Sequence, residues 1–491
     1  MKILFLTDNF PPERNAPATR TYEHAIEWMR AGHDVTVITT APNFPEGTLF
    51  SGYRNAWRSE EMLDGIRVVR VKTYITANQG FVKRTLDYLS FMVTGGIAAL
   101  RESRPDVLVT TSPQFFCAVA GWIVSRLRKL PWVFELRDLW PASIVAVGAM
   151  KKSLAIRVLE RLELRMYRDA DVVISVTNSF KQDLIGRGID AAKIAVVLNG
   201  VDMSKYFPMP KDEGMLEKYD LRDKFVVGYL GTHGMAHALD KVADAATLLR
   251  DRSDIVFAFA GAGARRAELE QTVRERGLTN VRLIPAQPKE RMPKLWSIQD
   301  VALIPLRDQP LFTTVIPSKM FEAMGMGVPI LMSLPEGEGT ALLRECGAGQ
   351  TVLPESPQAL ADAVVELAAS PERLDGFRSA GLAAAARFTR EHQAARMLEQ
   401  LERAIAAHEP AAHEAQQIES GLTAEARDPL TRSGVKAPTA FLPADVAQSS
   451  AAPAGRALLN GSALGKASAA SAKPTSAGES ARPVRIETIH G

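Results

Sequence analysis

The segment 316–330 places a lysine and a glutamate one helical turn apart, among small and apolar residues. Its pattern predicts a short helix that ends at Gly327. Lys319 then lies near the helix N-terminus, where unpaired backbone N–H groups and the helix dipole favour an anion such as a phosphate. Glu322 can accept hydrogen bonds from two vicinal hydroxyls, as on a ribose. With Ser318 beside them, these residues predict a nucleotide site; a lysine and a glutamate on a solvated face is the alternative.

A second loop, Gly231-Thr232-His233-Gly234-Met235-Ala236-His237, follows a predicted strand and precedes a predicted helix. Gly231 and Gly234 allow the backbone to approach a ligand closely. His233 and His237 lie four residues apart, but without a third ligand they are a poor zinc pair. We therefore expect one of these histidines to face a diphosphate. The other cations of the second half that we expect near the phosphates are Arg265 and Arg307.

Arg137 and Asp138 directly follow a predicted buried strand, 132–136. A carboxylate beside an arginine stays ionised. At the carboxyl end of a parallel strand this pair is expected to face a ligand cleft. Asp138 would orient an acceptor and stabilise positive charge at the reacting carbon. A buried structural ion pair is the alternative.

The loop 8–17 follows the first predicted strand but is not the G-x-G-x-x-G dinucleotide motif. Its three prolines make it stiff and remove backbone N–H groups, so it suits a pocket wall better than a phosphate cradle. The residues expected to bind the acceptor here are Glu13, Arg14 and Asn15.

Together these motifs resemble those of glycosyltransferase family 4, whose members have the GT-B fold. Residues 317–329 read P-S-K-x-x-E-A-x-x-x-G-x-P. The companion segments are Gly261–Glu270, Asp300–Leu306, Arg137–Pro141 and the Pro11-Pro12-Glu13 loop. The resemblance covers about residues 1–405. Within this family, the sequence resembles the bacterial subgroup that builds O-antigen, capsule or exopolysaccharide repeat units, and it is similar to the L-fucosamine transferases.

The resemblance implies a retaining transferase with a nucleotide-sugar donor in the second domain and the acceptor in the first. Arg137, Asp138 and Glu322 are then the expected catalytic residues. Because the leaving phosphate can take the acceptor's proton, neither a strong base nor a metal or other cofactor is expected. The chain departs from the family at Thr314, where a glutamate is common, and Lys241 is the nearest base after the glycine loop.

The elements around these motifs predict an α/β protein with two tandem, doubly wound Rossmann-like domains. Short apolar runs alternate with helical patterns, which is typical of parallel sheets covered on both faces. The strands expected are 2–6, 35–39, 66–71, 106–110, 132–136, 172–176 and 194–198, then 225–230, 254–260, 281–285, 300–304 and 328–332. The helices expected are 19–31, 83–102, 115–128, 153–168 and 178–187, then 237–250, 264–276, 289–297, 317–326 and 357–369, and helical patterns continue from Pro371 to about Ala407.

These elements divide the chain into four parts. Residues 1–205 form the acceptor-binding domain, with 199–224 read as a polar linker, and 206–386 form the nucleotide-sugar domain. A C-terminal helix, 387–408, is expected to cross back to the first domain. Residues 409–491 are rich in Ala, Ser and Pro and predict a disordered tail.

Composition excludes several classes of protein. The 491 residues carry 59 Lys and Arg against 56 Asp and Glu, a net charge of +3, so nucleic-acid binding is not expected. Two cysteines are too few for a disulfide framework. Asp169-Ala170-Asp171 resembles a metal-binding D-x-D, but capping at a helix–strand junction is expected. The apolar run that follows Met1 is too short for a secretory signal, and no apolar run is long enough to span a membrane. We therefore expect a cytoplasmic protein.

The predicted helix 153–168 suggests a peripheral membrane contact. Arg157, Arg161, Arg165 and Arg168 recur along one stripe. Other bases expected on this surface are Lys83, Arg84, Arg126, Arg128, Lys129, Lys151 and Lys152. Such a surface would suit anionic lipid at the inner face of the cytoplasmic membrane and a lipid-diphosphate-linked acceptor. A solvated helix that merely packs on the core is the alternative.

The sequence therefore predicts a retaining glycosyltransferase that uses a UDP-linked N-acetylhexosamine or 6-deoxyhexosamine. Two other functions remain open: a catalytically silent nucleotide-sugar-binding subunit, and a non-hydrolysing UDP-sugar 2-epimerase.

Overall fold

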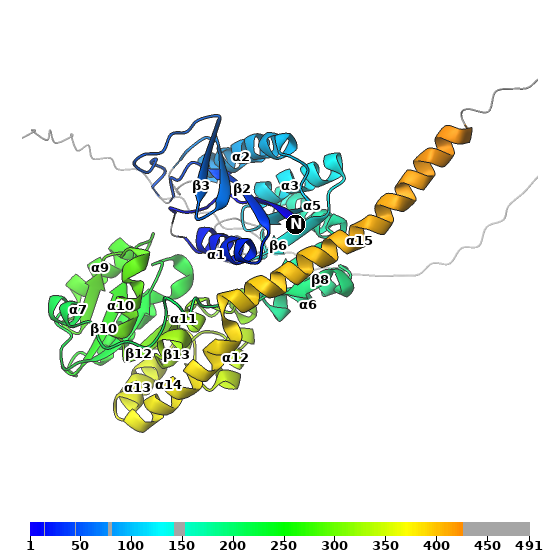
Figure 1. Cartoon of the computed structure of the whole chain (residues 1–491). Helices are drawn as coiled ribbons and strands as arrows, with labels where there is room; N and C mark the ends of the chain where they lie inside the picture. The colour runs from blue at the N-terminus through cyan, green and yellow to red at the C-terminus, as the bar shows by residue number, and fades with distance from the viewer. Residues whose placement is uncertain (14, 45, 77–80, 142–152, 426–491) are drawn as a thin grey trace, which may run out of the picture. The chain divides into compact units, whose positions relative to one another are not determined.

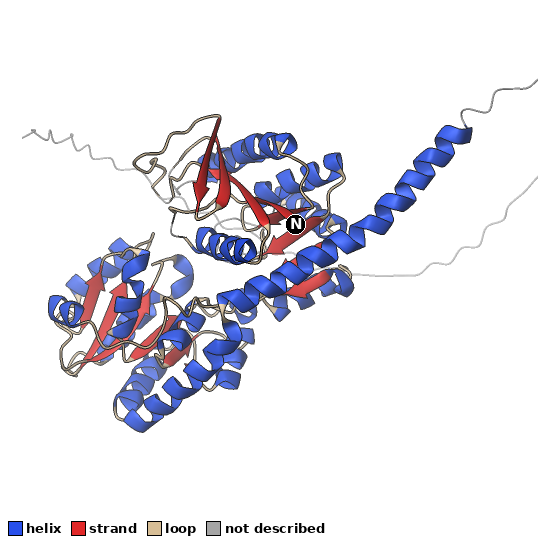
Figure 2. Ribbon diagram, viewed as in Figure 1, coloured by secondary structure: helices blue, strands red, loops and turns tan. Residues whose placement is uncertain are grey.

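The computed structural model describes residues 1–13, 15–44, 46–76, 81–141 and 153–425, and for 81–82 and 409–425 it describes the backbone alone. The described part holds two sheets flanked by helices (Figure 2). The predicted fold class, two doubly wound α/β domains, is confirmed.

The first domain is built on an eight-stranded sheet of order β3-β4-β2-β1-β5-β6-β7-β8. Its strands are β1 (Lys2–Leu6), β2 (Asp34–Thr40), β3 (Arg58–Leu63), β4 (Ile66–Val71), β5 (Val107–Thr111), β6 (Trp132–Leu136), β7 (Val172–Ser175) and β8 (Ile194–Val196). Every pairing is parallel except β3 with β4. The central strands are buried on both faces, as their continuous apolar runs predict.

Helices cover both faces of this sheet. Those of the first domain are α1 (Ala16–Arg30), α2 (Phe81–Arg101), α3 (Phe115–Arg128), α5 (Leu154–Asp169) and α6 (Asn178–Gly186), with the short η1 (Ala191–Lys193). The core on one face joins α2, α3 and α5 to the sheet. The core on the other face joins α1 to the sheet and to the last helix of the chain.

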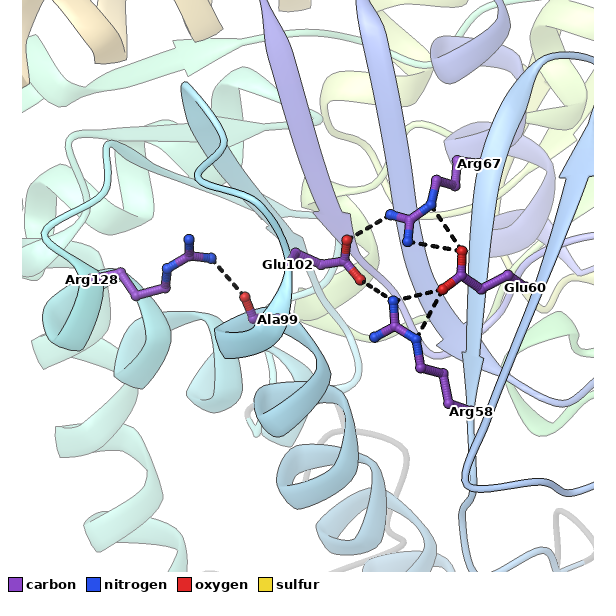
Figure 3. A network of polar contacts seen from close by, with 6 residues as sticks. All are labelled: Arg58, Glu60, Arg67, Ala99, Glu102 and Arg128. Atoms are coloured by element: carbon purple, nitrogen blue, oxygen red, sulfur yellow. Dashed lines mark hydrogen bonds and ion pairs between the residues drawn. The ribbon is translucent and has the colours of Figure 1, made fainter.

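The antiparallel edge strand β3 was not predicted, because its residues are charged rather than apolar. An ion-pair network holds it in place (Figure 3). Glu60 on β3 and Glu102 after α2 both bind Arg58 and Arg67, with Arg58 Nη2 and Arg67 Nη1 at 2.7 and 2.6 Å from the Glu102 carboxylate. A charged edge strand also discourages pairing with another chain.

The second domain has a six-stranded, all-parallel sheet of order β11-β10-β9-β12-β13-β14. Its strands are β9 (Phe225–Leu230), β10 (Ile255–Ala260), β11 (Val281–Ile284), β12 (Val301–Pro305), β13 (Ile330–Ser333) and β14 (Gly349–Val352). Its α-helices are α7 (Glu213–Lys218), α8 (Leu239–Leu248), α9 (Arg266–Glu275), α10 (Met292–Ser297), α11 (Lys319–Met326), α12 (Glu338–Cys346), α13 (Pro357–Ala368) and α14 (Pro371–Ala385). The short 3-10 turns are η2 (Met235–His237), η3 (Lys289–Arg291), η4 (Pro310–Thr314) and η5 (Ala386–Phe388).

Three elements of the second domain were missed: α7, α12 and β14. Helix α7 lies in the segment interpreted as a linker, and the Asp212 side chain caps it by accepting a hydrogen bond from Met215 N. It buries Met215 and Leu216, a pair too short to show a helical period. Strand β14 is half-buried and carries a glycine and two polar residues, so it lacks the apolar run of a central strand.

The last helix, α15 (Arg390–Glu425), leaves the second domain and packs on the first, where it contacts α1 (Figure 1). Its buried residues Ala394, Met397, Leu401 and Ala404 belong to the first domain's core. The predicted crossing is present, but the boundary at 408 needs correction because the helix runs on to Glu425. Residues 409–425 are rich in Ala, Glu and Gln, which are strong helix formers. The rest of the predicted tail, 426–491, lies outside the described residues.

Within the described ranges, no helix is long and apolar enough to cross a membrane.

Candidate functional site

A cavity of about 290 Å³ opens where α1 and the carboxyl end of β6 meet the loops of the second domain. We call it the interdomain cavity. Five cationic side chains and a single carboxylate line it, together with Gly231, Ser318 and apolar or neutral polar residues. The cations are Arg20, Arg137, Lys289, Lys319 and Arg390, and the carboxylate is Glu322. Such an excess of positive charge in a concave site suits a ligand with two or more negative charges.

Two of these cations come from the first domain. Arg20 on α1 is paired with the buried Glu135 of β6 (Nε–Oε1 2.8 Å) and donates to the carbonyls of Val197 and Leu198. Arg137 directly follows β6, and its Nη1 is buried without a hydrogen-bond partner among the described residues. Burial lowers the pKa of Arg137 to about 10. Arg137 is therefore charged and still able to donate to a ligand.

The C-terminal helix and the second domain supply the next two cations. Arg390 at the start of α15 and Lys289 in η3 both pair with Glu23 of α1, at 2.7 and 3.0 Å. The Nη1 of Arg390 is buried and has no hydrogen-bond partner in the described part of the chain. Like Arg137, it presents an unsatisfied guanidinium N–H group at this cavity. An unpaired buried donor of this kind is costly unless a ligand satisfies it.

Lys319 begins α11 and lies half-buried beside Gly231. Its Nζ lies 3.9 Å from the centre of the Tyr229 ring. Burial lowers the pKa of Lys319 to about 7, although Glu322 opposes the shift. Gly231 adopts φ 137°, where any other residue would be strained, and a Cβ there would approach the Lys319 side chain to 2.6 Å and displace its end.

Glu322 lies one turn along α11 and lines the same cavity. Its Oε2 accepts a hydrogen bond from Trp296 Nε1 at 3.2 Å. Burial raises the pKa of Glu322, with Arg390 and Trp296 acting against the shift. The structure thus brings together five predicted residues: Arg137, Gly231, Ser318, Lys319 and Glu322.

The two predicted histidines lie near this cavity but do not line it. His233 is fully buried, and burial lowers its pKa to about 4, with Arg266 and Lys319 adding to the shift. Burial also lowers the pKa of His237 to about 3. Both imidazoles are therefore neutral near pH 7 and supply no positive charge. The centre of each imidazole lies 5.7 Å from the centre of the Tyr229 ring, the ring that Lys319 Nζ contacts.

Arg265 and Arg307, the arginines of the second domain predicted to contact the phosphates, form ion pairs outside the interdomain cavity. Arg307 pairs with Asp240 and Glu355, at 2.6 and 2.7 Å. Arg265 pairs with Glu268 on the exposed start of α9. With Gly234 they line a separate cavity of about 20 Å³, too small for a sugar nucleotide. Thr314 ends η4, where its hydroxyl donates to the Leu311 carbonyl.

A second cavity, of about 240 Å³, lies within the first domain, and we call it the first-domain cavity. Asp8, Asn9 and Gln114 line it from the ends of β1 and β5, and Arg84, Asp87 and Tyr88 line it from α2. Asp8 Oδ1 and Gln114 Oε1 are buried and have no hydrogen-bond partner among the described residues. Burial raises the pKa of Asp8 well above its usual range, and Asp87 and Glu13 raise it further.

The predicted acceptor residues have different places. Asn15 lines the first-domain cavity and also caps α1, accepting from Ala18 N at 3.0 Å. Glu13 is buried beneath it and accepts hydrogen bonds from Asn9 Nδ2 and from the backbone N–H groups of Asn43 and Phe44. Arg14 lies outside the described residues. Asp138 is half-buried and is not among the residues lining either cavity.

The D-x-D of Asp169 and Asp171 serves the fold. Asp169 pairs with Arg126 and Arg165, and Asp171 Oδ2 accepts from Trp132 N at 2.8 Å. Within the described ranges no three His, Cys, Asp or Glu side chains are grouped so that they could hold a metal ion.

Sequence reasoning missed four charged residues of these sites: Arg20, Lys289, Arg390 and Asp87. Arg20, Arg390 and Asp87 sit on helices, where a charged residue normally indicates the solvated face. For Arg20 a signal did exist, because Glu135 is a lone acid inside the apolar strand β6 and needs a buried cation.

Comparisons with known proteins agree with this architecture. The family model "Glycosyl transferase 4-like domain" matches residues 15–200, and "Glycosyl transferases group 1" matches 224–370. WcaI of Escherichia coli K12, a glycosyl transferase ascribed to colanic acid biosynthesis, is 27% identical over 371 residues, which is 73% of this chain and 90% of WcaI.

Solved structures show the same fold. Sucrose-phosphate synthase from Thermosynechococcus elongatus superposes with a TM-score of 0.67 at 17% identity, covering 83% of this chain and 99% of that one. Anabaena HepE, solved with UDP and glucose, superposes with a TM-score of 0.60 at 19% identity, covering 82% and 99%. With a glycosyl transferase 4-like domain followed by a glycosyl transferases group 1 domain, the chain is a glycosyltransferase of the GT-B fold.

Proposed function

We propose that this glycosyltransferase moves a sugar, with retention, from a nucleotide-sugar donor to a lipid-linked saccharide in the synthesis of a cell-surface polysaccharide. One observation carries the donor half of the proposal. The interdomain cavity combines unsatisfied N–H groups of Arg137 and Arg390 with a half-buried lysine, Lys319, and a half-buried glutamate, Glu322. A nucleoside diphosphate needs both a cationic cradle for its phosphates and a carboxylate for its ribose hydroxyls.

The residues divide the donor between them. Arg137, Arg390 and Lys319 bind the diphosphate, beside the backbone of Gly231. Glu322 accepts hydrogen bonds from the ribose hydroxyls. As the bond between the sugar and the phosphate breaks, negative charge grows on the diphosphate and these fixed cations stabilise it. The departing phosphate oxygen takes the proton of the acceptor hydroxyl. A role of Asp138 in orienting the acceptor stays a prediction from the sequence, since its side chain lines neither cavity.

The acceptor saccharide occupies the first-domain cavity. Its wall includes Arg84, Asp87 and Tyr88 of α2, a helix that also carries the exposed apolar residues Val93 and Ile97. Exposed apolar side chains continue on α3 and α5. Those of the three helices are Leu86, Val93, Ile97, Leu100, Ile123, Leu127, Leu154 and Val158.

Exposed bases lie among these apolar residues, including Lys83, Arg157 and Arg161. Apolar side chains mixed with bases are the composition of a surface that binds anionic lipid. We call the exposed residues of α2, α3 and α5 the lipid-facing surface. Lys151 and Lys152, expected on this surface, lie outside the described residues. A lipid-diphosphate carrier held at the inner face of the cytoplasmic membrane would therefore meet the cavity beside α2.

The relatives support a donor and a product class. The name of WcaI refers to colanic acid, a polysaccharide, and HepE was solved with UDP. We therefore propose a UDP-linked donor. Two finer points stay predictions from the sequence. They are that the donor sugar is an N-acetylhexosamine or 6-deoxyhexosamine, and that the chain falls in the L-fucosamine-transferase-like subgroup.

Calorimetric titration with UDP, followed by transfer from a panel of UDP-sugars to membrane extracts, tests the proposal. Binding of UDP together with a labelled lipid-linked product supports it. Binding without transfer or donor hydrolysis would favour the silent binding subunit. Formation of an epimer from the UDP-sugar alone would favour the 2-epimerase. Absence of UDP binding would remove the donor assignment.

A further inference from the structure

The first-domain cavity is lined on one side by hydrogen-bond acceptors that nothing in the described chain satisfies. Asp8 and Gln114 are each more than nine-tenths buried, and Asp8 Oδ1 and Gln114 Oε1 lack partners. The neighbouring amide of Asn9 is already used, because its Nδ2 donates to Glu13 and its Oδ1 accepts from Gln114 Nε2, both at 2.8 Å. A ligand that satisfies these oxygen atoms must therefore supply O–H or N–H donors.

The opposite wall is α2, which adds a further carboxyl and a cation. Asp87 is half-buried, whereas Arg84 is exposed and donates to Tyr88 Oη at 3.0 Å. The charged groups of the cavity are thus arranged unevenly. The carboxyl groups of Asp8 and Asp87 line its inside, whereas the positively charged Arg84 is exposed to solvent. A ligand that carries its negative charge outside the cavity and only hydroxyls inside matches this arrangement.

We propose that the first-domain cavity selects an acceptor whose entering sugar is uncharged and rich in hydroxyls, and that Asp8 and Asp87 exclude sugars bearing a carboxylate. This inference rests on the proposed function, since it specifies the saccharide that the cavity takes. A site built to bind hydroxyls discriminates strongly, because a ligand without them leaves its buried acceptors unpaired. A uronic acid would in addition bring its carboxylate beside the carboxyl groups of Asp8 and Asp87.

The protonation of Asp87 makes the selection dependent on pH. Burial and, after it, Glu13 raise the pKa of Asp87 to about 7, with Arg84 acting against the shift. The ionisable groups that face it are Asp8 and Glu13 in the loop after β1, and Arg84 and Tyr88 of α2. Above pH 7 the Asp87 carboxyl is ionised and repels an acidic sugar, whereas below pH 7 it is protonated and can donate to one.

The experiment compares three matched pairs of methyl glycosides: glucoside and glucuronide, galactoside and galacturonide, mannoside and mannuronide. Binding to the full-length protein is measured by ligand-observed NMR at pH 6 and pH 8. At pH 8 we expect at least one neutral glycoside to bind, and its acidic partner to bind at least about tenfold more weakly. The ratio should shrink at pH 6, because the uronic acid stays ionised while Asp87 takes up a proton.

Variants tie the discrimination to the cavity. Asp87→Asn should flatten the pH dependence and let the acidic glycoside approach its neutral partner. Asp251→Asn, an exposed aspartate of the second domain outside both cavities, is the matched control and should leave both ratios unchanged. Because Asp8→Asn alters a wholly buried group and could fail to fold, Asp87 is the deciding position.

The outcomes are separable from those of the proposed function. Equal or tighter binding of every acidic glycoside overturns the selection, and so does the absence of any glycoside binding while UDP still binds. If UDP neither binds nor supports transfer, the glycosyl-donor assignment fails instead. An unchanged ratio in Asp87→Asn, with the fold intact, removes Asp87 from the selection.

Discussion

Arg20 of α1 and Glu135 of β6 form an ion pair in which the two side chains are only 2% and 1% exposed (Nε–Oε1 2.8 Å). Glu135 lies within an otherwise apolar strand, and Arg20 lines the interdomain cavity. Although burial by itself raises the pKa of Glu135, the guanidiniums of Arg20 and Arg137 hold it below its ordinary value. The glutamate thus anchors a cation of the ligand site from inside the sheet.

Glu135→Gln should lower the free energy of unfolding by about 3–5 kcal/mol, because it leaves Arg20 as a buried charge without its partner. Urea denaturation measures the loss. The double variant Glu135→Gln with Arg20→Met removes both charges and should recover much of it. A loss below about 1 kcal/mol in the single variant would show that other groups compensate Arg20.

The Arg20–Glu135 pair also makes the free energy of unfolding depend on pH, in a direction that follows from the pKa of Glu135. The folded pKa of Glu135 is depressed, so its contribution to stability is fully present above the unfolded value of about 4.3. That contribution is lost as the pH falls through the folded pKa. The stability difference between wild type and Glu135→Gln should therefore narrow in acid, and a difference that widens there would contradict the pairing.

Lys319 should make donor binding weaken as the pH rises above 7. Its pKa is about 7 in the empty cavity, and a diphosphate binds the protonated amine. Affinity for UDP should therefore fall by up to about tenfold per pH unit until the pKa of the complex is reached. Calorimetry between pH 7 and 8.5 measures this, since in that range the terminal phosphate of UDP is largely ionised and its uracil is largely uncharged. Lys319→Arg remains charged throughout and should abolish the slope.

Glu322→Gln should impair donor binding and leave acceptor binding unchanged. The amide keeps the shape but replaces one acceptor oxygen with a donor, so a charge-assisted hydrogen bond to the ribose is lost. Such bonds contribute about 1.5–3 kcal/mol, equivalent to roughly a ten- to hundredfold loss of UDP affinity. Wild-type UDP affinity in a folded Glu322→Gln protein would mean that Glu322 is not the ribose ligand.

Arg157→Gln with Arg161→Gln should weaken sedimentation with anionic vesicles and spare UDP binding. Each base at an anionic surface contributes about 1 kcal/mol, so the pair should cost roughly tenfold or more. Arg165, which pairs with Asp169, is left in place. The matched control replaces Arg250 and Arg274, two exposed arginines of the second domain. An equal loss of vesicle sedimentation in both double variants would mean that α5 is a solvated helix with no specific contact to lipid.

Truncation after residue 408 should leave the melting temperature and UDP affinity close to wild type, because all the described side chains of α15 that belong to the first domain's core, from Ala394 to Ile405, are kept. Met397→Ala, in contrast, removes a fully buried side chain from the first domain's core and should cost about 2–5 kcal/mol. Thermal unfolding of the two proteins gives the comparison. A large loss in the truncated protein would show that residues beyond 408 pack on the domains.

The central strands could be predicted because burial on both faces forces a continuous apolar run, as in β1 and β5. The edge strands β3 and β14 could not, since each has a solvated face or few apolar residues and depends on its neighbours. Ion pairs that join distant parts of the chain, such as Glu102 with Arg58, leave no mark on local periodicity.

The site shows the same division. Lys319, Glu322, Ser318 and Gly231 could be named because a turn, a helix start and a glycine constrain them locally. Arg390 could not, since only the crossing of α15 brings it from 253 residues beyond Arg137 to the same cavity. Arg307 shows the converse, because nothing in its local sequence reveals that Asp240 and Glu355 already hold its charge.

The packing of α15 has a consequence for how the chain is made. The core shared by α1 and the first sheet contains Ala394, Met397, Leu401 and Ala404. The ribosome therefore synthesises the last part of the first domain about two hundred residues after its last strand, β8. Until then the nascent first domain has an open apolar face. A fragment ending at residue 205 is therefore an unfinished fold, and it would need the peptide 390–408 in trans to close that face.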